Sequence, residues 1–158
     1  MIYQHENYAN VKDDIKPLII KHWEEIALNQ DIIELNPDWD AYGQLDASGS
    51  LRVFTVRDDE LLVGYFVVIV SRSLHYKDHL FANNDIIFVL PEYRKGTTGI
   101  KLIDFAEREL EAEGVRLLNI NTKDHQSFDA ILQRRGYQMI ERVYSKVGRL
   151  WLSRRLVR

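Results

Sequence analysis

Residues 83–114 read NNDIIFVLPEYRKGTTGIKLIDFAERELEAEG, and this stretch decides the fold. Its apolar run at 86–90 is rich in β-favouring residues, which is typical of a strand covered on both faces. Pro91 cannot donate a hydrogen bond to a neighbouring strand, so we expect the strand to end there. From Ile100 onward apolar residues recur at helical spacing until Gly114, a residue type that often ends a helix. The stretch therefore predicts a strand, a short loop and a helix.

The loop between them, RKGTTG, has the features of an anion-binding site. The first amides of a helix have no partner within it, and the aligned peptide dipoles place partial positive charge there. Gly96 and Gly99 let an anion approach the backbone, while Arg94 and Lys95 add charge. The spacing is neither a Walker loop nor GxGxxG, which disfavours a nucleoside triphosphate. The loop is a candidate pyrophosphate cradle; the alternative is an ordinary helix start with turn glycines.

The segment VLPEYRKGTTGIKLIDFAE resembles motif A of the Gcn5-related N-acetyltransferases, the GNAT family. In that family V-x-P-x-x-R/Q-x-x-G-x-G/A leads from a strand into a helix, and the loop amides hold the pyrophosphate of coenzyme A. Val89, Pro91, Arg94 and Gly99 fit the pattern, whereas Thr97 stands where the family usually has glycine. The resemblance extends over most of the chain, and LHYKDHLFANNDIIFVLPEYRKG is similar to GNAT-like proteins encoded by bacteriophages and prophages.

The resemblance implies that acetyl-CoA is the cosubstrate. No metal is expected, because the five histidines show no HExxH or comparable spacing. A backbone amide near Val89 or Leu90 would stabilise the oxyanion, and the amides of residues 95–100 would bind the pyrophosphate. The positions implied for the coenzyme are Val89, Leu90, Arg94, Lys95, Gly96, Thr97, Thr98, Gly99 and Ile100.

A general base is harder to assign, because the glutamate of the family's strand falls near Asn83, an amide. Asp85 lies two residues further on, on the same face of the strand, and could accept a proton directly or through a water. The alternative is that Asp85 only caps or ends the strand. His75 and His79 are alternatives for the same role, because histidine is a common proton acceptor in proteins, unless they belong to an exposed polar loop.

The identity of the general acid is equally open. The second part of the resemblance, HQSFDAILQRRGYQMIERVY, only partly fits the family, and its usual tyrosine falls on Leu132. Tyr144 and Tyr137 are substitutes by residue type, although packing across strands is the commoner role of such a side chain. Water could also protonate the thiolate, since a free thiol titrates near ~8.5.

The acceptor side of the family's site is built by the early helices and by the segment before the loop strand. We therefore expect Tyr76 and Lys77, with Trp39 and Tyr42, to bind the acceptor, the alternative being that the last two belong to the core. The basic end of the chain, RLWLSRRLVR, is either a solvated edge strand or a contact for an acidic partner, a dimer mate or a nucleic acid.

The composition places the chain among globular proteins. At 158 residues, with 46% hydrophobic and 28% charged residues, we expect one domain, 1–158, with a sizeable core. There is no apolar run long enough for a membrane span and no signal-peptide pattern, so we expect a cytoplasmic protein. The sequence has no cysteine, which excludes a thiolate nucleophile, and no HExxH motif for a metal. A net charge of −3 argues against general nucleic-acid binding.

The order of elements indicates an α/β (α+β) fold. Strands are expected at residues 2–10, 51–56, 61–71, 86–90, 115–122, 137–147 and 150–157, and helices at 13–26, with Pro17 near its start, 38–47, 100–113 and 123–135. The resemblance makes this the GNAT fold, a mixed and mostly antiparallel sheet of about six or seven strands flanked by about four helices. In that fold the strands before and after the loop helix splay apart to admit the pantetheine.

The function that follows is an N-acetyltransferase that moves an acetyl group from acetyl-CoA to a primary amine by direct attack. The alternative is a non-catalytic GNAT-like module that binds an acyl-CoA or a partner protein. The nature of the amine, a protein group or a small molecule, and the existence of a homodimer are left open by the sequence.

Overall fold

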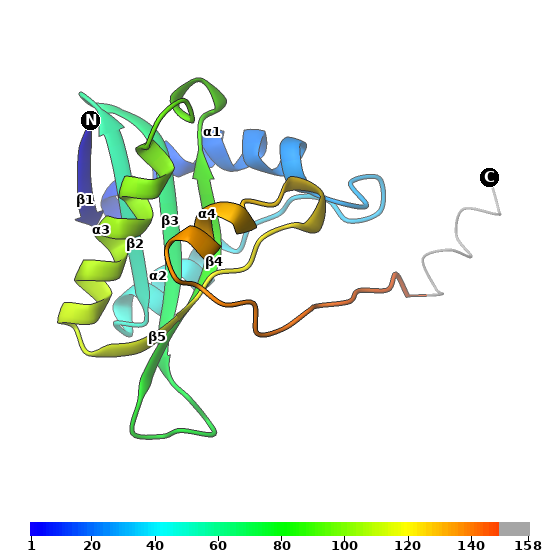
Figure 1. The fold of residues 1–158 in the computed structure, drawn as a ribbon. Coiled ribbons are helices and arrows are strands. Elements are labelled where there is room, and N and C mark those ends of the chain that lie inside the picture. Colours follow the sequence, from blue (N-terminus) through cyan, green and yellow to red (C-terminus); the bar gives the residue numbers. More distant parts are fainter. Residues whose placement is uncertain (149–158) are drawn as a thin grey trace.

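The computed structural model describes residues 1–148, and its centre is a five-stranded sheet with the strand order β1-β2-β3-β4-β5 (Figure 1). The strands are β1 Ile2–Glu6, β2 Leu51–Asp58, β3 Leu61–Arg72, β4 Leu80–Val89 and β5 Val115–Asn119. The helices are α1 Tyr8–Ile26, α2 Trp39–Ala47, α3 Thr98–Ala112 and α4 Asp129–Arg134, with 3-10 turns at Pro91–Tyr93 and Asp124–Gln126.

The sheet is mixed and mostly antiparallel, as the family resemblance implies. Strands β1 to β4 pair antiparallel in chain order, whereas β5 pairs parallel with β4. A parallel pair needs a crossover connection, and here α3 supplies it. The strand, loop and helix of residues 83–114 therefore form one half of a β-α-β unit at the edge of the sheet.

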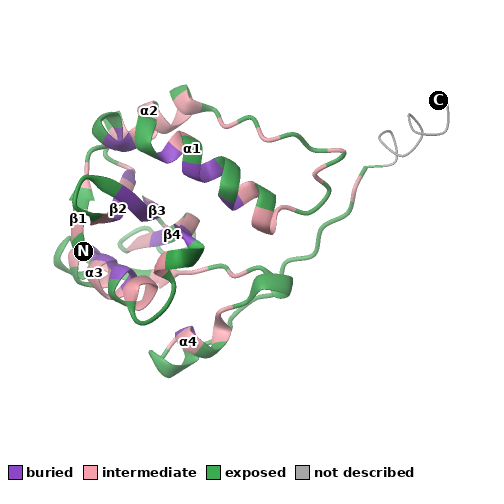
Figure 2. Cartoon of the chain, turned by 90° about the horizontal axis from the view of Figure 1, so that it is seen from above, coloured by how far each residue is buried: buried purple, intermediate pink, exposed green. Residues whose placement is uncertain are grey.

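Helices cover both faces of the sheet: α1 and α2 lie on one face and α3 on the other (Figure 2). Each long helix turns an apolar stripe inward; that of α3 is Leu102, Ile103, Ala106 and Leu110, and that of α1 includes Val11, Ile15, Leu18 and Ile19. Because β3 lies between these layers, seven consecutive residues of it are buried. Within residues 1–148 no helix is both long and apolar enough to cross a membrane.

Helix α1 begins earlier than the sequence predicts. It starts at Tyr8, so that Pro17 lies in its interior rather than near its start, and Asp13 and Asp14 are not first-turn residues. An interior proline removes one helical hydrogen bond. The burial of the apolar stripe against the sheet outweighs that loss, since tertiary packing supplies most of a helix's stability.

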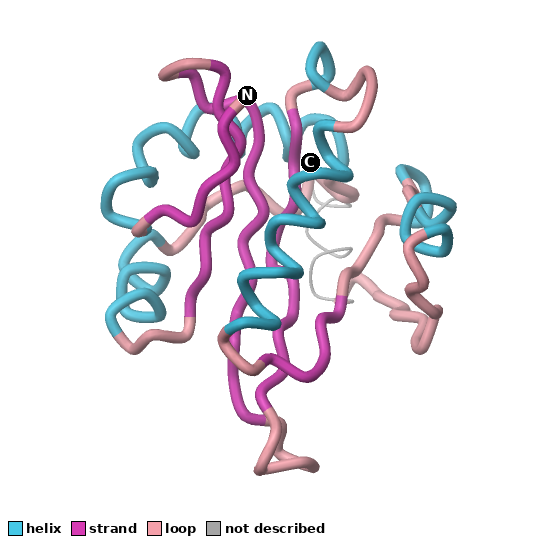
Figure 3. The backbone as a smooth tube through the Cα atoms, turned by 60° about the vertical axis from the view of Figure 1, so that its left-hand side comes forward, coloured by secondary structure: helices cyan, strands magenta, loops and turns pink. Residues whose placement is uncertain are grey.

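Strand β4 is also longer than predicted and starts at Leu80 instead of residue 86. Its first half, LFANND, is too polar to be recognised as a strand, but β3 pairs with it as far as Arg72. Helix α4 is shorter than the predicted 123–135, because residues 124–126 form a separate 3-10 turn. Figure 3 shows α4 standing apart from the sheet, beyond β5.

The expectation of six or seven strands is not met in residues 1–148. Residues 137–147 form no strand, and the other late strand, 150–157, lies outside the described residues. Residues 137–147 have β-favouring side chains but no neighbouring strand to complete their backbone hydrogen bonds. Strand propensity is mainly a preference for a pleated, half-buried surface, so it is not realised without a neighbour.

Gly64 in β3 permits the close approach of β4 near its end. A Cβ atom on Gly64 would lie 2.9 Å from the carbonyl oxygen of Phe88 and equally close to side-chain atoms of Val56 and Val89. No side chain can be placed there unless the backbone of β4 moves. The glycine therefore holds in place the strand end that leads into the loop.

We predict that Gly64→Ala lowers the free energy of unfolding by about 1–3 kcal/mol, because overpacking against a backbone atom forces the strands apart. Gly43→Ala is the matched control, since its Cβ would meet its nearest neighbour at an ordinary 3.9 Å and alanine favours the interior of α2. Urea unfolding of the three proteins measures both changes. Equal stability of Gly64→Ala and wild type would show that the strands are not held at this distance.

Candidate functional site

Strands β4 and β5 separate after a short paired region. Their register runs from Leu80 with Val115 to Asn83 with Asn119, and β5 ends there while β4 continues to Val89. Two side chains mark the point of separation: Asn119 Nδ2 donates to Asn83 Oδ1 at 2.8 Å, and the Asn121 amide donates to Asn84 Oδ1 at 2.6 Å. The second half of β4 therefore has β3 on one side and an opening on the other.

The register decides which backbone groups face this opening. The Leu90 amide donates to the Val63 carbonyl at 2.8 Å, so the backbone N–H and C=O of Leu90 face β3. Hydrogen-bonding direction alternates along an antiparallel strand, and the polar groups of Val89 and Ile87 consequently face the opening. Of the two amides expected to stabilise an oxyanion, that of Val89 is available and that of Leu90 is already used.

Arg94 crosses the end of this opening. Its Nε donates to the Val89 carbonyl at 2.7 Å, and its two terminal nitrogens donate to the carboxylate of Glu25 at 2.6 and 2.7 Å. The guanidinium also lies 5.2 Å from the centre of the Phe88 ring. The ion pair lowers the pKa of Glu25 through the hydrogen bonds from Arg94. The charge of Arg94 is thus compensated by α1 rather than directed toward the loop.

The start of α3 offers unsatisfied amides. The first helical hydrogen bond runs from the Lys101 amide to the Thr97 carbonyl at 2.8 Å, which leaves the amides of Thr98, Gly99 and Ile100 without a helical acceptor. No side chain caps them. Gly96 has a φ of +96°, a conformation that glycine adopts without strain, and nothing lies within 4 Å of the place where its Cβ would be. Backbone donors, an open approach and exposed Lys95 fit an anion such as a pyrophosphate.

Asp85 lies on β4 just beyond the point of separation. Val67 pairs with Ile86 and Val68 with Asn84, so Asp85 is the extra residue of a β-bulge. Its carboxylate accepts a hydrogen bond from the hydroxyl of Tyr42, on α2. Burial, followed by this hydrogen bond and the charge of Asp85, raises the pKa of Tyr42, which keeps the phenol protonated as a donor. The structure thus joins two residues that sequence reasoning had considered separately.

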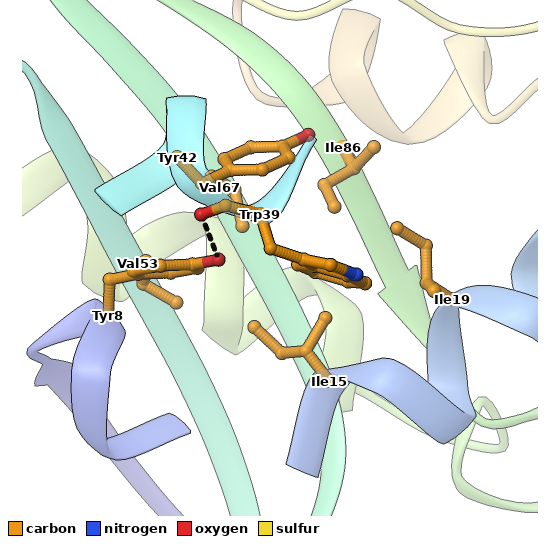
Figure 4. Close-up of a pocket in the computed structure, with 8 residues that line it drawn as sticks. All are labelled: Tyr8, Ile15, Ile19, Trp39, Tyr42, Val53, Val67 and Ile86. Carbon is orange, nitrogen blue, oxygen red and sulfur yellow. Dashed lines mark hydrogen bonds between the residues drawn. The ribbon is translucent and has the colours of Figure 1, made fainter. Parts of the chain in front are cut away.

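A small apolar cavity has Tyr42 in its wall (Figure 4). It measures about 10 Å³ and is lined by Tyr8, Ile15, Ile19, Trp39, Tyr42, Val53, Val67 and Ile86. Such a volume holds at most one water molecule, and its lining is apolar. Trp39 and Tyr42 accordingly pack against the core here.

A buried histidine supports the strand from the α1 side. His22 is 6% exposed, stacks on Phe88 at a ring distance of 4.8 Å, and shares a hydrogen bond with the Tyr65 hydroxyl at 3.2 Å from its Nδ1. Burial lowers the pKa of His22 to about 4; Glu25 opposes this shift, and the charges of Arg94 and Lys123 add to it. His22 is therefore neutral at physiological pH.

Other predicted site residues lie elsewhere. Tyr76 and Lys77, with His75 and His79, belong to the β3–β4 hairpin, which projects at the end of the sheet opposite the loop at Pro91–Tyr93 (Figure 1). Tyr144 is 85% exposed on the segment that leaves the body, and Leu132 is buried. The ion pair of Glu25 with Arg94 could not be predicted from the sequence, because 69 positions separate the two residues.

No protein-family model matches the chain, and no curated protein sequence does. Solved structures share its fold. An aminoglycoside acetyltransferase from an uncultured soil metagenomic sample, in complex with sisomicin, has a TM-score of 0.70 at 12% identity over 93% of this chain and 96% of that one. The ribosomal-protein-alanine N-acetyltransferase of Brucella melitensis biovar Abortus has a TM-score of 0.68 at 14% identity, over 94% and 99%. A predicted acetyltransferase of Clostridium acetobutylicum with acetyl-CoA has a TM-score of 0.66 at 11% identity, over 94% and 96%.

We predict that His22 makes the stability of the protein fall between pH 6.5 and about 4. The unfolded chain binds the proton first as the pH falls, so the free energy of unfolding decreases through this window, by about 3 kcal/mol for a shift of this size. His22→Gln keeps a hydrogen-bonding group near Tyr65 but does not titrate. Urea unfolding of both proteins across the window should show a shallower pH dependence for the variant, and identical slopes would contradict this account of His22.

Proposed function

We propose that this chain is an N-acetyltransferase that transfers the acetyl group of acetyl-CoA to a primary amine by direct attack. The observation that carries the proposal is the opening between β4 and β5, with the free amide of Val89 on its edge and an uncapped helix start at its end. The fold, which the chain shares with acetyltransferases at 11–14% identity, supports the reaction class but not the acceptor.

The loop residues fit the phosphate end of the cosubstrate. The amides of Thr98, Gly99 and Ile100 would donate to the pyrophosphate, and Lys95 would add a positive charge that no described ion pair uses. Gly96 leaves the approach open. Thr97, where the family pattern usually has glycine, is exposed and contributes an amide like any other residue. Arg94 would contribute less than its position suggests, because Glu25 holds its guanidinium.

Acetyl-CoA supplies an acetyl group activated as a thioester. Val89 would donate its amide to the carbonyl oxygen of that group and so stabilise the negative charge that develops as the amine attacks. Holding both reactants in the opening contributes to the rate by itself, since well-oriented reactants gain roughly 7–11 kcal/mol over free ones. The chain thus needs few specialised side chains for this reaction.

Asp85 is the proton acceptor in this proposal. Its carboxylate would take a proton from the attacking amine directly or through a water, and the hydroxyl of Tyr42 would hold the carboxylate in position. Leu132 stands where the resemblance places the family's tyrosine, Tyr144 is exposed, and the hydroxyl of Tyr137 donates to Glu107. Water would therefore protonate the thiolate, which is a good leaving group.

A second function remains, a module that binds an acyl-CoA without transferring it. The observation in its favour is the same Leu132, together with the amide at Asn83 where the family has a glutamate. The two functions differ in the release of thiol.

Calorimetry would measure the binding of acetyl-CoA, and thiol release would then be followed in the same sample with a series of amines. Release that any amine accelerates supports the transferase. Binding without release supports the module.

We predict that Gly99→Asp abolishes the binding of coenzyme A while the protein stays folded. The φ of Gly99 is not in the left-handed region, and its Cβ would meet its nearest neighbour, Val89, at 3.9 Å, so a side chain is tolerated. The added carboxylate would repel a pyrophosphate at the helix start. Gly99→Ala is the control and should retain most of the affinity. Calorimetry measures both, and unchanged affinity of Gly99→Asp would remove this loop from the binding site.

We predict that Asp85→Asn lowers the acetyl-transfer rate at neutral pH on the order of 10²-fold, the usual contribution of a general base, with little change in coenzyme affinity. Tyr42→Phe should lower the rate less, because the carboxylate remains but loses its donor. Asp46→Asn, at the end of α2, is the control. Steady-state rates with one amine separate these cases. A normal rate in Asp85→Asn would show that Asp85 has a structural role in the bulge and is not the proton acceptor.

A further inference from the structure

An ion pair joins the last turn of α1 to the end of β4. Glu25 accepts hydrogen bonds from both terminal nitrogens of Arg94, at 2.6 and 2.7 Å, and Arg94 Nε donates to the Val89 carbonyl at 2.7 Å. A planar guanidinium that binds a carboxylate with two parallel hydrogen bonds has a well-defined orientation. Through the side chain of Arg94, Glu25 thus acts on the backbone of Val89.

The turn after β4 brings Arg94 back over the end of the strand. Pro91 begins this turn, and the Arg94 amide donates to the Pro91 carbonyl at 3.2 Å. The guanidinium then lies 5.2 Å from the centre of the Phe88 ring, which also stacks on His22 at a ring distance of 4.8 Å. An aromatic contact therefore supports the guanidinium in addition to its hydrogen bonds.

The peptide unit between Val89 and Leu90 is held at both of its ends. Its carbonyl oxygen accepts from Arg94 Nε, and its N–H donates to the Val63 carbonyl at 2.8 Å. The preceding peptide unit carries the Val89 amide, which faces the opening between β4 and β5. Consecutive peptide planes are joined by only two soft dihedral angles, so fixing one plane limits the direction in which the other points its N–H.

We propose that Glu25 is a positioning residue for acetyl transfer: it holds Arg94 on the Val89 carbonyl and so directs the Val89 amide at the acetyl carbonyl oxygen. This inference rests on the proposed function, in which that amide stabilises the oxyanion. The pair acts through geometry rather than net charge, because the carboxylate balances the guanidinium. A donor stabilises an oxyanion only if it is aimed at the place where the negative charge develops.

The ion pair can be broken without disturbing the core, since the side chains of Arg94 and Glu25 are 40% and 26% exposed. Glu25→Gln keeps the size of the side chain but leaves the charge of Arg94 uncompensated. That charge attracts the phosphates of coenzyme A, whereas the less constrained Val89 peptide slows the reaction. Turnover should therefore fall without a loss of coenzyme affinity, a combination that general damage to the fold does not produce.

We expect Glu25→Gln to lower kcat for acetyl transfer about tenfold, less than the roughly 10²–10³-fold cost of removing an oxyanion donor. Coenzyme affinity, measured by calorimetry, should be unchanged or higher. Arg94→Lys, which keeps the charge but loses the planar fork, should also lower kcat. Glu24→Gln is the control, because it makes the same change of charge at the exposed neighbouring position of α1. A kcat in Glu25→Gln equal to that of the control, or a parallel loss of coenzyme affinity, would overturn the proposal.

The infrared spectrum of bound acetyl-CoA tests the same geometry without turnover. A hydrogen bond to the thioester carbonyl lowers its stretching frequency, and carbon-13 in that carbonyl separates its band from those of the protein. Wild type should lower the frequency, and Glu25→Gln should return it toward that of free acetyl-CoA; equal frequencies in the two proteins would overturn the role of Glu25.

The failure of the proposed function gives a different result. A wild type that binds acetyl-CoA but releases no thiol with any amine would overturn the transfer reaction, and the infrared shift would still decide whether Glu25 directs the Val89 amide. A wild type that does not bind acetyl-CoA would overturn both.

Discussion

The site depends on one constraint, that β4 is hydrogen-bonded on both sides in its first half and on one side only in its second. The pairing with β5 ends at Asn83 and Asn119, where the side chains of Asn83 and Asn84 accept hydrogen bonds from the Asn119 side chain and the Asn121 amide. Beyond that point the backbone of Val89 faces an opening, while β4 stays paired with β3 on its other side as far as Gly64 and Val89. A binding edge is thus obtained without any loss of the core.

The second determinant is the distribution of charge around this opening. Arg94 is the most basic group of the loop, yet it is satisfied by Glu25, by the Val89 carbonyl and by the Phe88 ring. It fixes the end of α1 to the end of β4, close to the buried pair of His22 and Tyr65. In the proposed site, the attraction for a phosphate would therefore come mainly from the helix amides and from the side chain of Lys95.

The bulge at Asp85 links the sheet to α2. An extra residue in one strand redirects its side chain, and here it places the carboxylate within reach of the Tyr42 hydroxyl. The rings of Trp39 and Tyr42 pack on the core, so apolar contacts hold the Tyr42 hydroxyl in place. The pair lies at the rim of this apolar layer, with Asp85 itself exposed to solvent.

The strand–loop–helix unit of residues 86–114 and the helix start at the loop could be predicted from the sequence, because periodicity, Pro91 and the glycines are local signals, whereas the type of the sheet was implied only by the resemblance. The sequence by itself did not determine the length of β4, the start of α1 or the fate of residues 137–147, since each depends on whether a neighbouring surface is present. Only the tertiary structure joined Arg94 to Glu25 and Asp85 to Tyr42, and separated Tyr76, Lys77 and Tyr144 from the opening. Such pairs lie 43 or 69 positions apart, and no local pattern encodes contacts at that separation.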